Sequence, residues 1–324
     1  MKIIDKLPKP FFALAPLDDV SDTVFRRIIA GCAKPDLLFT EFTNVDALQS
    51  AGREATLRRL DFDKSEEPII AQIWGKNPEN FKKTTEECAA RDFAGVDLNM
   101  GCPIKHVVKN GCCSALINDR DKAKIIIDST KAGLGKDMAF SVKTRLGFSG
   151  VDLSWIEFLL KQNPDMLIIH LRTVKEMSKV PAHWDLMPKI KRLRDEIAPD
   201  TLLVGNGDVA DRNHGEVLAE KYGIDGIMIG RGIFHDPFAF SKETQWAAYE
   251  PLKRLKLYEK QVRLFKTVWK NNERPIVTLN KFCKIYVNGF SGAKEMREDL
   301  MHAVNSDDLL EKIRAIKDRL VTDG

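Results

Sequence analysis

The sequence lacks the long apolar runs, the signal-peptide pattern and the glycine-rich motif that mark several common protein classes. No stretch reaches the roughly 20 consecutive apolar residues that a membrane-spanning helix needs. The opening residues, MKIIDKLPKPFF, carry charges and have no apolar centre, so they do not resemble a secretory signal. We therefore expect a cytoplasmic protein that has no membrane partner.

The cysteines show neither the spacing of a zinc site nor the density of a disulfide framework. No CxxC pair is present, and the chain is long enough to depend on a hydrophobic core for its stability. We expect free thiols in a reducing compartment and no bound metal. The six cysteines are Cys32, Cys88, Cys102, Cys112, Cys113 and Cys283.

What the sequence does contain is an ordinary globular composition with an uneven distribution of charge. It is 44% hydrophobic and 30% charged, which excludes a disordered chain or a coiled coil. The net charge of +4 arises in the C-terminal part, where residues 251–284 hold 10 basic and 2 acidic side chains. Such a segment favours a polyanionic partner, although a solvated helical face explains the charge equally well.

Short apolar segments alternate with amphipathic helical patterns over the first 240 residues. Strands that are apolar almost throughout are typical of a parallel sheet covered on both faces. Eight such units in this length predict an α/β fold of the (β/α)8 TIM-barrel type. A doubly wound open sheet is the alternative, but no GxGxxG follows the first strand. The predicted strands are residues 11–16, 37–42, 68–74, 95–101, 138–147, 166–173, 201–208 and 226–232.

The residues after about 252 have helical periodicity. Five apolar residues between 255 and 269 recur at helical spacing, and we expect them to face the barrel. A further helix is predicted over residues 307–320. We therefore predict a catalytic barrel over residues 1–242 and a helical domain over residues 243–324. The basic residues expected on another face of the first helix are Lys256, Lys260, Arg263 and Lys270.

Polar and reactive residues stand at the carboxyl ends of the predicted strands, where barrel enzymes place their chemistry. The turns GNGD and GRG follow the last two strands. Their glycines permit close approach of a ligand, and Arg231 adds a cation, so the pattern favours a phosphate site. Turns with incidental glycines are the alternative. By the two-residue period of a strand, His170 and Arg172 share one face.

Seven segments in order resemble the tRNA-dihydrouridine synthase family over about residues 11–240. They are APLDDVSDTVFR, AQIWG, LNMGCPIKHVVKNGCCSALI, VKTRLGF, HLRTVKEMSKVPAHWD, VGNGDV and MIGRG. The basic tail resembles the helical tRNA-binding domain of that family. The resemblance implies an enzyme that uses FMN and NADPH to reduce D-loop uridines of tRNA to 5,6-dihydrouridine. Nothing in the sequence requires an obligate protein partner.

The resemblance also implies a role for each reactive residue. Reduction of uracil needs a hydride at C6 and a proton at C5, and Cys102 matches the cysteine that donates the proton. A thiol with a pKa near ~8.5 is mostly protonated at neutral pH and can serve as an acid. Lys143 matches the lysine that contacts the flavin ring, where it would stabilise developing negative charge. Gln72 matches a glutamine that hydrogen-bonds the same ring.

The remaining roles fall into two groups. The residues expected to hold the flavin are Pro16, Leu17 and Asp18 below the ring, His170 beside it, and Asn206, Gly207, Asp208, Gly230 and Arg231 at its phosphate. The residues expected to contact RNA are Asn99, Lys105 and Arg172 near the catalytic loop, and Lys256, Lys260 and Arg263 in the tail.

The sequence departs from the family pattern at two places. Leu171 stands where the family usually has glycine, which affects how closely the backbone approaches the ligand. Cys112 and Cys113 stand where small glycine or alanine residues are common, and we interpret them as compact packing residues.

Two other functions have to be weighed. A flavin barrel that acts on a small pyrimidine, such as a dihydroorotate dehydrogenase, would share the phosphate turns but would not need the basic helical tail. A catalytically silent tRNA-binding protein would need neither Cys102 nor Lys143.

Overall fold

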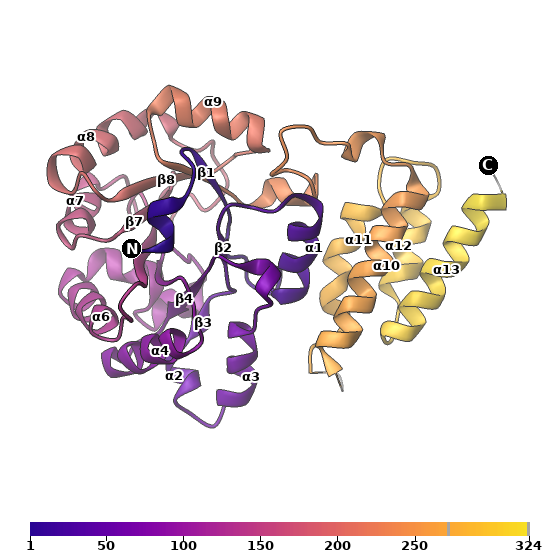
Figure 1. Ribbon diagram of the computed structural model, residues 1–324, viewed down its shortest axis with the longest axis horizontal. Coiled ribbons are helices and arrows are strands. Elements are labelled where there is room, and N and C mark those ends of the chain that lie inside the picture. Colours follow the sequence, from indigo (N-terminus) through magenta and orange to yellow (C-terminus); the bar gives the residue numbers. More distant parts are fainter. Residues whose placement is uncertain (271–272, 323–324) are drawn as a thin grey trace.

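The structure is a computed structural model that describes residues 1–270 and 273–322. A barrel of parallel strands surrounded by helices forms the larger part, and a bundle of helices stands beside it (Figure 1). No helix in the described ranges is both long and apolar enough to span a membrane.

The strands form a closed parallel barrel, which confirms the predicted TIM-barrel fold. Their order is β1-β9-β8-β7-β6-β5-β4-β2, and a bridge between Ala13 and Leu37 joins the two ends of this sheet. The strands are β1 (Phe11–Leu14), β2 (Leu38–Phe39), β3 (Thr43–Asn44), β4 (Ile69–Trp74), β5 (Gly95–Met100), β6 (Ala139–Arg145), β7 (Met166–His170), β8 (Leu202–Asn206) and β9 (Gly226–Ile229).

The second strand is shorter than predicted because a side chain interrupts its ladder. The strand was expected over residues 37–42, but β2 ends at Phe39. The next residue, Thr40, still donates its N–H to Ile70 O, at 3.0 Å, but its hydroxyl accepts the N–H of Gln72, at 3.1 Å. The chain then turns and pairs again with β4 through β3. The interruption carries Glu41 into a buried position.

The barrel helices begin where their capping residues are. The predicted start at Asn77 is confirmed, because its side chain accepts the N–H of Glu79 and Pro78 occupies the first helical position. Asp22 caps the first helix in the same way through Phe25 N. The helices are α1 (Thr23–Ala33), α2 (Val45–Leu48), α3 (Arg53–Leu57), α4 (Pro78–Ala90), α5 (Lys105–Lys109), α6 (Arg120–Ala132), α7 (Leu153–Lys161), α8 (Met187–Ile197) and α9 (Arg212–Tyr222).

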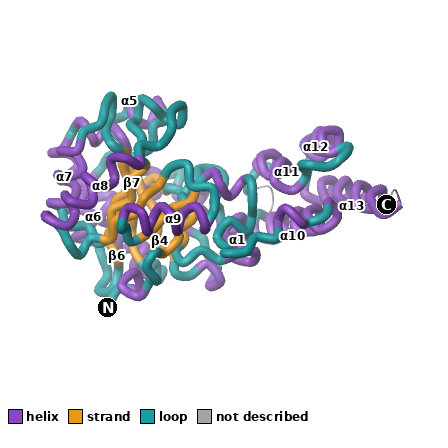
Figure 2. The backbone as a smooth tube through the Cα atoms, turned by 90° about the horizontal axis from the view of Figure 1, so that it is seen from above, coloured by secondary structure: helices purple, strands orange, loops and turns teal. Residues whose placement is uncertain are grey.

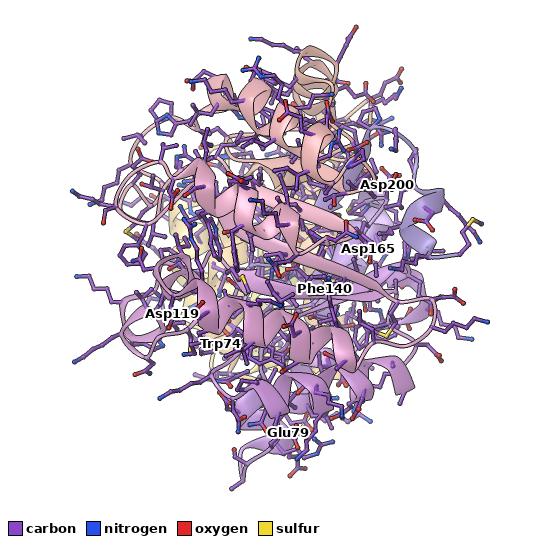
Figure 3. The ribbon with its side chains drawn as sticks, turned by 90° about the vertical axis from the view of Figure 1, so that its left-hand side faces the viewer. Trp74, Glu79, Asp119, Phe140, Asp165 and Asp200 are labelled. Atoms are coloured by element: carbon purple, nitrogen blue, oxygen red, sulfur yellow. The ribbon has the colours of Figure 1, made fainter. Side chains whose placement is uncertain are left out.

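The two ends of the barrel are different. In Figure 3, Trp74 at the end of β4 and Asp119 before α6 lie on one side, and Asp165 and Asp200, which precede strands, lie on the other. The N-terminal η1 (Ile3–Lys6) closes the amino end, where Ile4 packs against the apolar interior of the barrel. The carboxyl end therefore stays accessible for ligands.

The C-terminal part is a helical bundle with its own core. The five apolar residues predicted on the first helix are buried, but they pack mainly within the bundle, and Trp269 alone of them has a hydrogen bond to the barrel, at Asp22. The predicted boundary at residue 242 falls between η6 (Arg231–Phe234) and η7 (Trp246–Ala248). The remaining elements are α10 (Pro251–Val268), η9 (Ile276–Leu279), α11 (Asn280–Tyr286), α12 (Ala293–Met301) and α13 (Ser306–Thr322).

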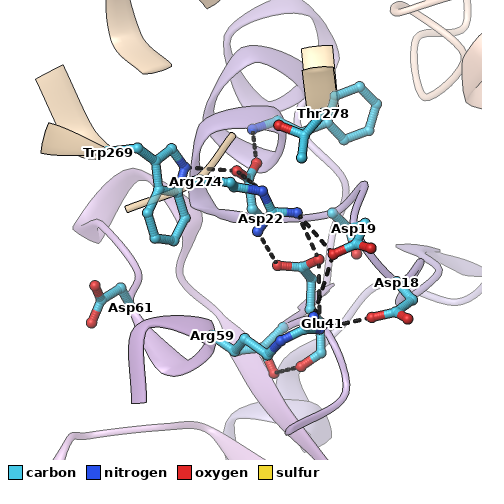
Figure 4. A network of polar contacts seen from close by, with 12 residues as sticks. Asp18, Asp19, Asp22, Glu41, Arg59, Asp61, Trp269, Arg274 and Thr278 are labelled. Atoms are coloured by element: carbon cyan, nitrogen blue, oxygen red, sulfur yellow. Dashed lines mark hydrogen bonds and ion pairs between the residues drawn. The ribbon is translucent and has the colours of Figure 1, made fainter. Parts of the chain in front are cut away.

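A polar network joins the bundle to the loops at the carboxyl end of the barrel (Figure 4). Arg274 is 10% exposed and binds both carboxylate oxygens of Glu41, at 3.0 and 3.2 Å, and lies 3.5 Å from Asp19. The indole of Trp269 donates to Asp22 at 2.9 Å. Three acidic side chains come together here, but each already forms an ion pair with the guanidinium group of Arg274 or Arg59. We therefore assign this network to the domain junction rather than to a metal.

Apolar and main-chain contacts complete this junction. The rings of Phe25 and Phe282 stack with their centroids 4.9 Å apart. Lys281 in α11 donates to Asp19 O at 2.7 Å, and Arg58 donates to Val268 O at 2.8 Å. Contacts on both polar and apolar groups hold the bundle at a defined angle to the barrel.

Candidate active site

A cavity of about 530 Å³ opens at the carboxyl end of the barrel. Most residues singled out from the sequence line it, although they come from seven different strand ends. They are Pro16, Leu17, Gln72, Asn99, Cys102, Lys143, His170, Arg172, Asn206, Gly207, Asp208, Gly230 and Arg231. Asp18, Lys105 and the three tail cations are not part of this lining.

Positive charge dominates one wall of the cavity. Burial, and next the nearby Arg145, lower the pKa of Lys143 to about 8. Burial and the same two cations lower the pKa of His170 to about 2, so that its imidazole is neutral at physiological pH. Within the described residues, the Lys143 ammonium has no hydrogen bond or ion pair. The wall therefore suits an anionic ligand, which would relieve the mutual repulsion of these cations.

A chain of hydrogen bonds links the barrel interior to the loop after β5. Asp97, fully buried, accepts from Ser141 at 2.6 Å and from Gln72 at 2.7 Å. The side-chain oxygen of Gln72 in turn accepts a hydrogen bond from Asn99 Nδ2, at 3.1 Å. Asn99 Oδ1 accepts the backbone N–H of Cys102, at 3.0 Å. Gln72 and Asn99 thus fix the start of the loop that carries the reactive thiol.

The two glycine turns after β8 and β9 pack against each other. Gly207 has φ +127°, a conformation that favours glycine, and a Cβ there would lie 2.9 Å from the Cβ of Ala182. A Cβ on Gly232 would lie 2.2 Å from Ala210 O, so the second turn also depends on close backbone approach. Asn206 ties the turns together by donating to Met228 O at 2.8 Å. Their backbone forms a compact rim to which the exposed Arg231 adds its charge.

Arg172 is held inside the protein rather than extended toward solvent. Its side chain is 3% exposed and donates to Val180 O and to Asp208. Its remaining nitrogen lies 3.2 Å from His170 Nε2, which confirms that these two residues share a face. The predicted contact of Arg172 with RNA stays a prediction, and the structure gives its guanidinium a role in fixing the β8 turn.

Asp18 and Lys105 lie outside the cavity. The carboxylate of Asp18 is exposed and pairs with Arg59 at 2.7 Å, and its predicted place below a flavin ring stays a prediction. Lys105 is exposed at the start of α5, beside the mouth.

Cys102 lies at the cavity mouth and is 8% exposed. A hydrogen bond with the Cys113 thiol, opposed by burial, is the main cause that lowers the pKa of Cys102 to about 7. The carbonyl of Cys102 accepts from the Ser114 hydroxyl at 2.7 Å. The sequence predicted a thiol with an ordinary pKa, whereas this buried thiol has a lowered one.

Arg145 is a cavity residue that the sequence reasoning missed. It donates to Gly101 O at 2.9 Å, to Thr173 O at 3.0 Å and to Met177 O at 2.9 Å, and so joins two loops around the cavity. The signal was available, because Arg145 stands two residues after Lys143 and a strand places such residues on the same face.

The basic residues of α10 face away from α11. Tyr258 and Gln261 contact α11, at Cys283 and Tyr286. Lys256, Lys260 and Arg263 each stand two residues from one of these positions, and a two-residue step turns about 200° around a helix. All three are exposed.

The bundle presents α11, not this face of α10, to the cavity side. Lys281 of α11 reaches the loop after β1, and α11 packs against η6 after β9. Figure 2 shows α11 and α12 on the same side as α5, with α10 and α13 on the other. The structure therefore does not bring the three α10 cations together with the cavity.

Comparison with known proteins identifies relatives along nearly the whole chain. Residues 13–321 match the family model described as dihydrouridine synthase (Dus). A probable tRNA-dihydrouridine synthase of Staphylococcus aureus (strain COL) is 49% identical over 300 residues, covering 92% of this chain and 90% of that protein. A probable tRNA-dihydrouridine synthase 2 of Bacillus subtilis (strain 168) is 47% identical over 316 residues, covering 97% and 94%.

Solved structures share the barrel at much lower identity. Morphinone reductase superposes with a TM-score of 0.52 at 10% identity, covering 71% of this chain and 84% of that one. Histamine dehydrogenase from Rhizobium sp. 4-9 gives 0.53 at 14% identity, covering 78% and 48%. At such identities the similarity concerns the fold alone.

Proposed function

The chain belongs to the dihydrouridine synthase family, and on this premise we propose that it reduces D-loop uridines of tRNA to 5,6-dihydrouridine with FMN and NADPH. The observation that carries the proposal is a single cavity that holds an acidified thiol, Cys102, beside a wall of cations. A tRNA substrate also makes the cytoplasm the expected compartment.

The cavity residues fit an anionic flavin. The rim formed by residues 206–208 and 230–231 would hold the phosphate through backbone N–H groups and Arg231, and Lys143 and Gln72 would contact the ring. When bound and reduced by NADPH, FMN supplies the hydride that adds to C6 of uracil. The cavity suits an anionic flavin because, among the described residues, the charge of Lys143 has no partner and is repelled by that of Arg145.

The protein's own contribution to the reaction is a positioned proton. Cys102 carries it on Sγ at the cavity mouth, where a uracil ring extruded from the RNA can place C5 beside it. Asn99 holds the Cys102 N–H and Arg145 holds the preceding carbonyl, of Gly101, so that the backbone that carries the thiol is fixed. As the proton leaves, the cations of the wall stabilise the thiolate that remains.

One experiment distinguishes this function from the two alternatives. The purified protein is expected to be yellow, with flavin absorption, and to raise the dihydrouridine content of tRNA from a strain that lacks it. A yellow protein that oxidises or reduces free pyrimidines and leaves tRNA unchanged would support the small-molecule enzyme. A colourless protein that cannot be loaded with FMN, yet binds tRNA, would support the silent binder.

We expect Arg231→Ala to weaken FMN binding roughly tenfold. The guanidinium is 60% exposed, so its contact with a phosphate is worth the lower part of the 1.5–3 kcal/mol typical of charged hydrogen bonds. The measurement is titration of the flavin-free protein with FMN, followed by flavin fluorescence. Lys242→Ala, an exposed cation outside the cavity, is the control. Equal affinities for both variants would remove Arg231 from the phosphate site.

The orientation of the bundle indicates which cations meet tRNA. A uridine that enters the cavity brings the rest of the RNA over the cavity side, where α5 and α11 lie. Lys281 and Lys284, three residues apart, share the exposed face of α11, and Lys105 stands at the mouth. We therefore place the main phosphate contacts on α11 and α5. The sequence had already placed Lys105 of α5 at the RNA, but it placed the contacts of the tail on Lys256, Lys260 and Arg263.

We expect Lys284→Glu to weaken tRNA binding and to reduce the slope of log affinity against log salt by about one, because one phosphate contact is lost. The matched control is Lys260→Glu, the same change on the α10 face, for which we expect an unchanged slope. Fluorescence anisotropy of labelled tRNA across a salt series measures both. If Lys260→Glu lowers the slope and Lys284→Glu does not, the original assignment to α10 is correct.

A further inference from the structure

A carboxylate lies inside the barrel, at a place where apolar residues are usual. Asp97 is 0% exposed, whereas the interior of such a barrel is normally filled with bulky apolar side chains. A buried carboxylate is costly unless hydrogen bonds satisfy it. Asp97 does not line the cavity, so the reaction described above gives it no role. In the sheet it is the direct neighbour of Gln72 on β4 and of Ser141 on β6.

The hydrogen bonds of Asp97 give a direction to the chain of contacts that runs from it to the cavity. Its carboxylate accepts from Ser141 Oγ at 2.6 Å and from Gln72 Nε2 at 2.7 Å. Burial raises the pKa of Asp97 to about 6, so at pH 7 the group is mainly charged and can only accept. Gln72 must therefore turn its amide nitrogen toward Asp97 and its oxygen toward Asn99.

The backbone at the other end of the chain requires the same direction. Asn99 Oδ1 accepts the N–H groups of Gly101 and Cys102, at 3.2 and 3.0 Å, and backbone nitrogens can only donate. The amide nitrogen of Asn99 is thereby turned toward Gln72 Oε1, at 3.1 Å. A carboxylate at one end and two N–H groups at the other leave one consistent arrangement of both amides.

This arrangement determines which atom of Gln72 is left for a ligand. Gln72 lines the cavity, and its Nε2 carries two hydrogens, of which Asp97 accepts one. In the part of the chain that the structure describes, no second acceptor is bonded to this nitrogen. Gln72 therefore keeps an N–H for an acceptor atom of a bound ring, while its oxygen is turned to Asn99.

We propose that Asp97 is a positioning residue that sets the direction of this hydrogen-bond chain. Through it, Gln72 becomes a donor to an acceptor atom of the flavin ring, and Asn99 becomes the acceptor that holds the loop at Cys102. The proposal rests on the proposed function, because it takes the flavin as the ligand and Cys102 as the acid. Asp97 acts only through the two amides and transfers no proton.

Hydrogen exchange at the backbone of Gly101 and Cys102 measures the loop end of the chain. Mass spectrometry with residue-level fragmentation follows both N–H groups in the purified flavoprotein. In Asp97→Leu, which is similar in size and has no acceptor, both should exchange about tenfold faster, because the amides are free to turn. Asp97→Asn should stay close to the unchanged protein, since its oxygen can still accept from Gln72 while its new amide nitrogen donates to Ser141 Oγ.

Asp225→Leu is the matched control, because it removes a buried carboxylate from the amino end of the barrel. Asp225 is 12% exposed and accepts the N–H of Leu203 at 2.9 Å. This variant should lose overall stability and leave the exchange of Gly101 and Cys102 unchanged. Unchanged exchange in Asp97→Leu would overturn the proposal, and so would equal acceleration in both variants, because Asp97 would then only stabilise the barrel.

Interchanging the two groups tests the direction itself and keeps the proposal testable if Asp97→Leu folds poorly. In Gln72→Glu two carboxylates face each other without a donor between them, so at pH 8 the Cys102 N–H should exchange faster. Adding Asp97→Asn restores a donor, because the new amide at position 97 donates to the new carboxylate at position 72, whose other oxygen still accepts from Asn99. The double variant should therefore recover slow exchange. Equal exchange with and without Asp97→Asn would overturn the proposal.

The same double variant tests what Gln72 presents to the ligand. Position 72 then has no N–H, so FMN should bind about tenfold more weakly than to Asp97→Asn alone, as measured by flavin fluorescence during titration of the flavin-free proteins. Equal affinities would reject the donor contact with the flavin. Exchange needs neither tRNA nor turnover. If no form of the protein can be loaded with FMN, the proposed function fails, and the exchange results still decide whether Asp97 directs the chain.

Discussion

Replacing Cys102 by alanine is expected to slow the transfer from reduced flavin to tRNA by about 10²–10⁴-fold, the usual cost of losing a positioned general acid. Reduction of the flavin by NADPH should stay near its normal rate, because the thiol is not needed until uracil is present. Single-turnover reoxidation of the reduced flavin by tRNA isolates the affected step, and absorption of the bound flavin shows that the variant is folded and loaded.

Two further substitutions sharpen this result. Cys102→Ser should be nearly as slow as the alanine variant, because a hydroxyl is a much weaker acid than a thiol. Cys112→Ala should stay within a few-fold of the unchanged protein, since Cys112 does not line the cavity. Normal reoxidation in Cys102→Ala would require another proton donor. His170 is the nearest alternative in the cavity, but its lowered pKa leaves it without an extra proton at neutral pH.

The same step should depend on pH in a defined direction. The proton is present on Cys102 below its pKa of about 7 and is lost above it. The single-turnover rate should therefore be level in acid and fall about tenfold per pH unit above 7, provided that proton transfer limits it.

Replacing Glu66 by glutamine is expected to destabilise the protein by about 3–5 kcal/mol. Glu66 and Arg26 form an ion pair in which both side chains are 0% exposed. Glu66 also accepts from Asp63 N at 2.8 Å, and Arg26 donates to Ser21 O and Asp61 O. Loss of the carboxylate charge leaves the guanidinium of Arg26 buried without its counter-ion. The free-energy cost of this unpaired charge is much larger than the net stabilisation that the ion pair provides.

Glu157→Gln provides the comparison for this effect. Glu157 pairs with Lys161 one turn along α7, at 2.6 Å, with the two side chains 40% and 60% exposed. Such a surface pair contributes about 0.3–0.5 kcal/mol, so the urea midpoint should barely move. The measurement is urea unfolding of both variants at pH 7. Equal midpoints would mean that the pair of Arg26 and Glu66 does not hold α1 to the barrel as the structure indicates.

The barrel and most of its cavity could be predicted because both follow from local patterns. Apolar runs of strand length mark the barrel, and parallel strands all end on one side, so the residues near their carboxyl ends, such as Gln72 and His170, had to meet. The end of β2 at Phe39 could not be predicted. There the hydroxyl of Thr40, rather than a backbone carbonyl, accepts the N–H of Gln72, and threonine is otherwise common in strands.

The orientation of the helical bundle relative to the barrel could not be predicted from the sequence, for a different reason. Periodicity shows which residues of α10 are exposed, but not which side of the helix the rest of the chain will cover. Lys256 and Lys260 therefore looked like the RNA-binding face until α11 was seen to lie opposite them.

The contacts of Arg274 and Trp269 with the loop after β1 and with Glu41 have a consequence for how a substrate is chosen. These contacts fix the distance between the exposed face of α11 and the Cys102 sulfur. If tRNA docks on α11, the nucleotide that reaches Cys102 is the one whose distance from the docking point equals this separation. On the proposed function, the protein would then select a uridine by its distance and angle from the docked surface, without contacts to the neighbouring bases.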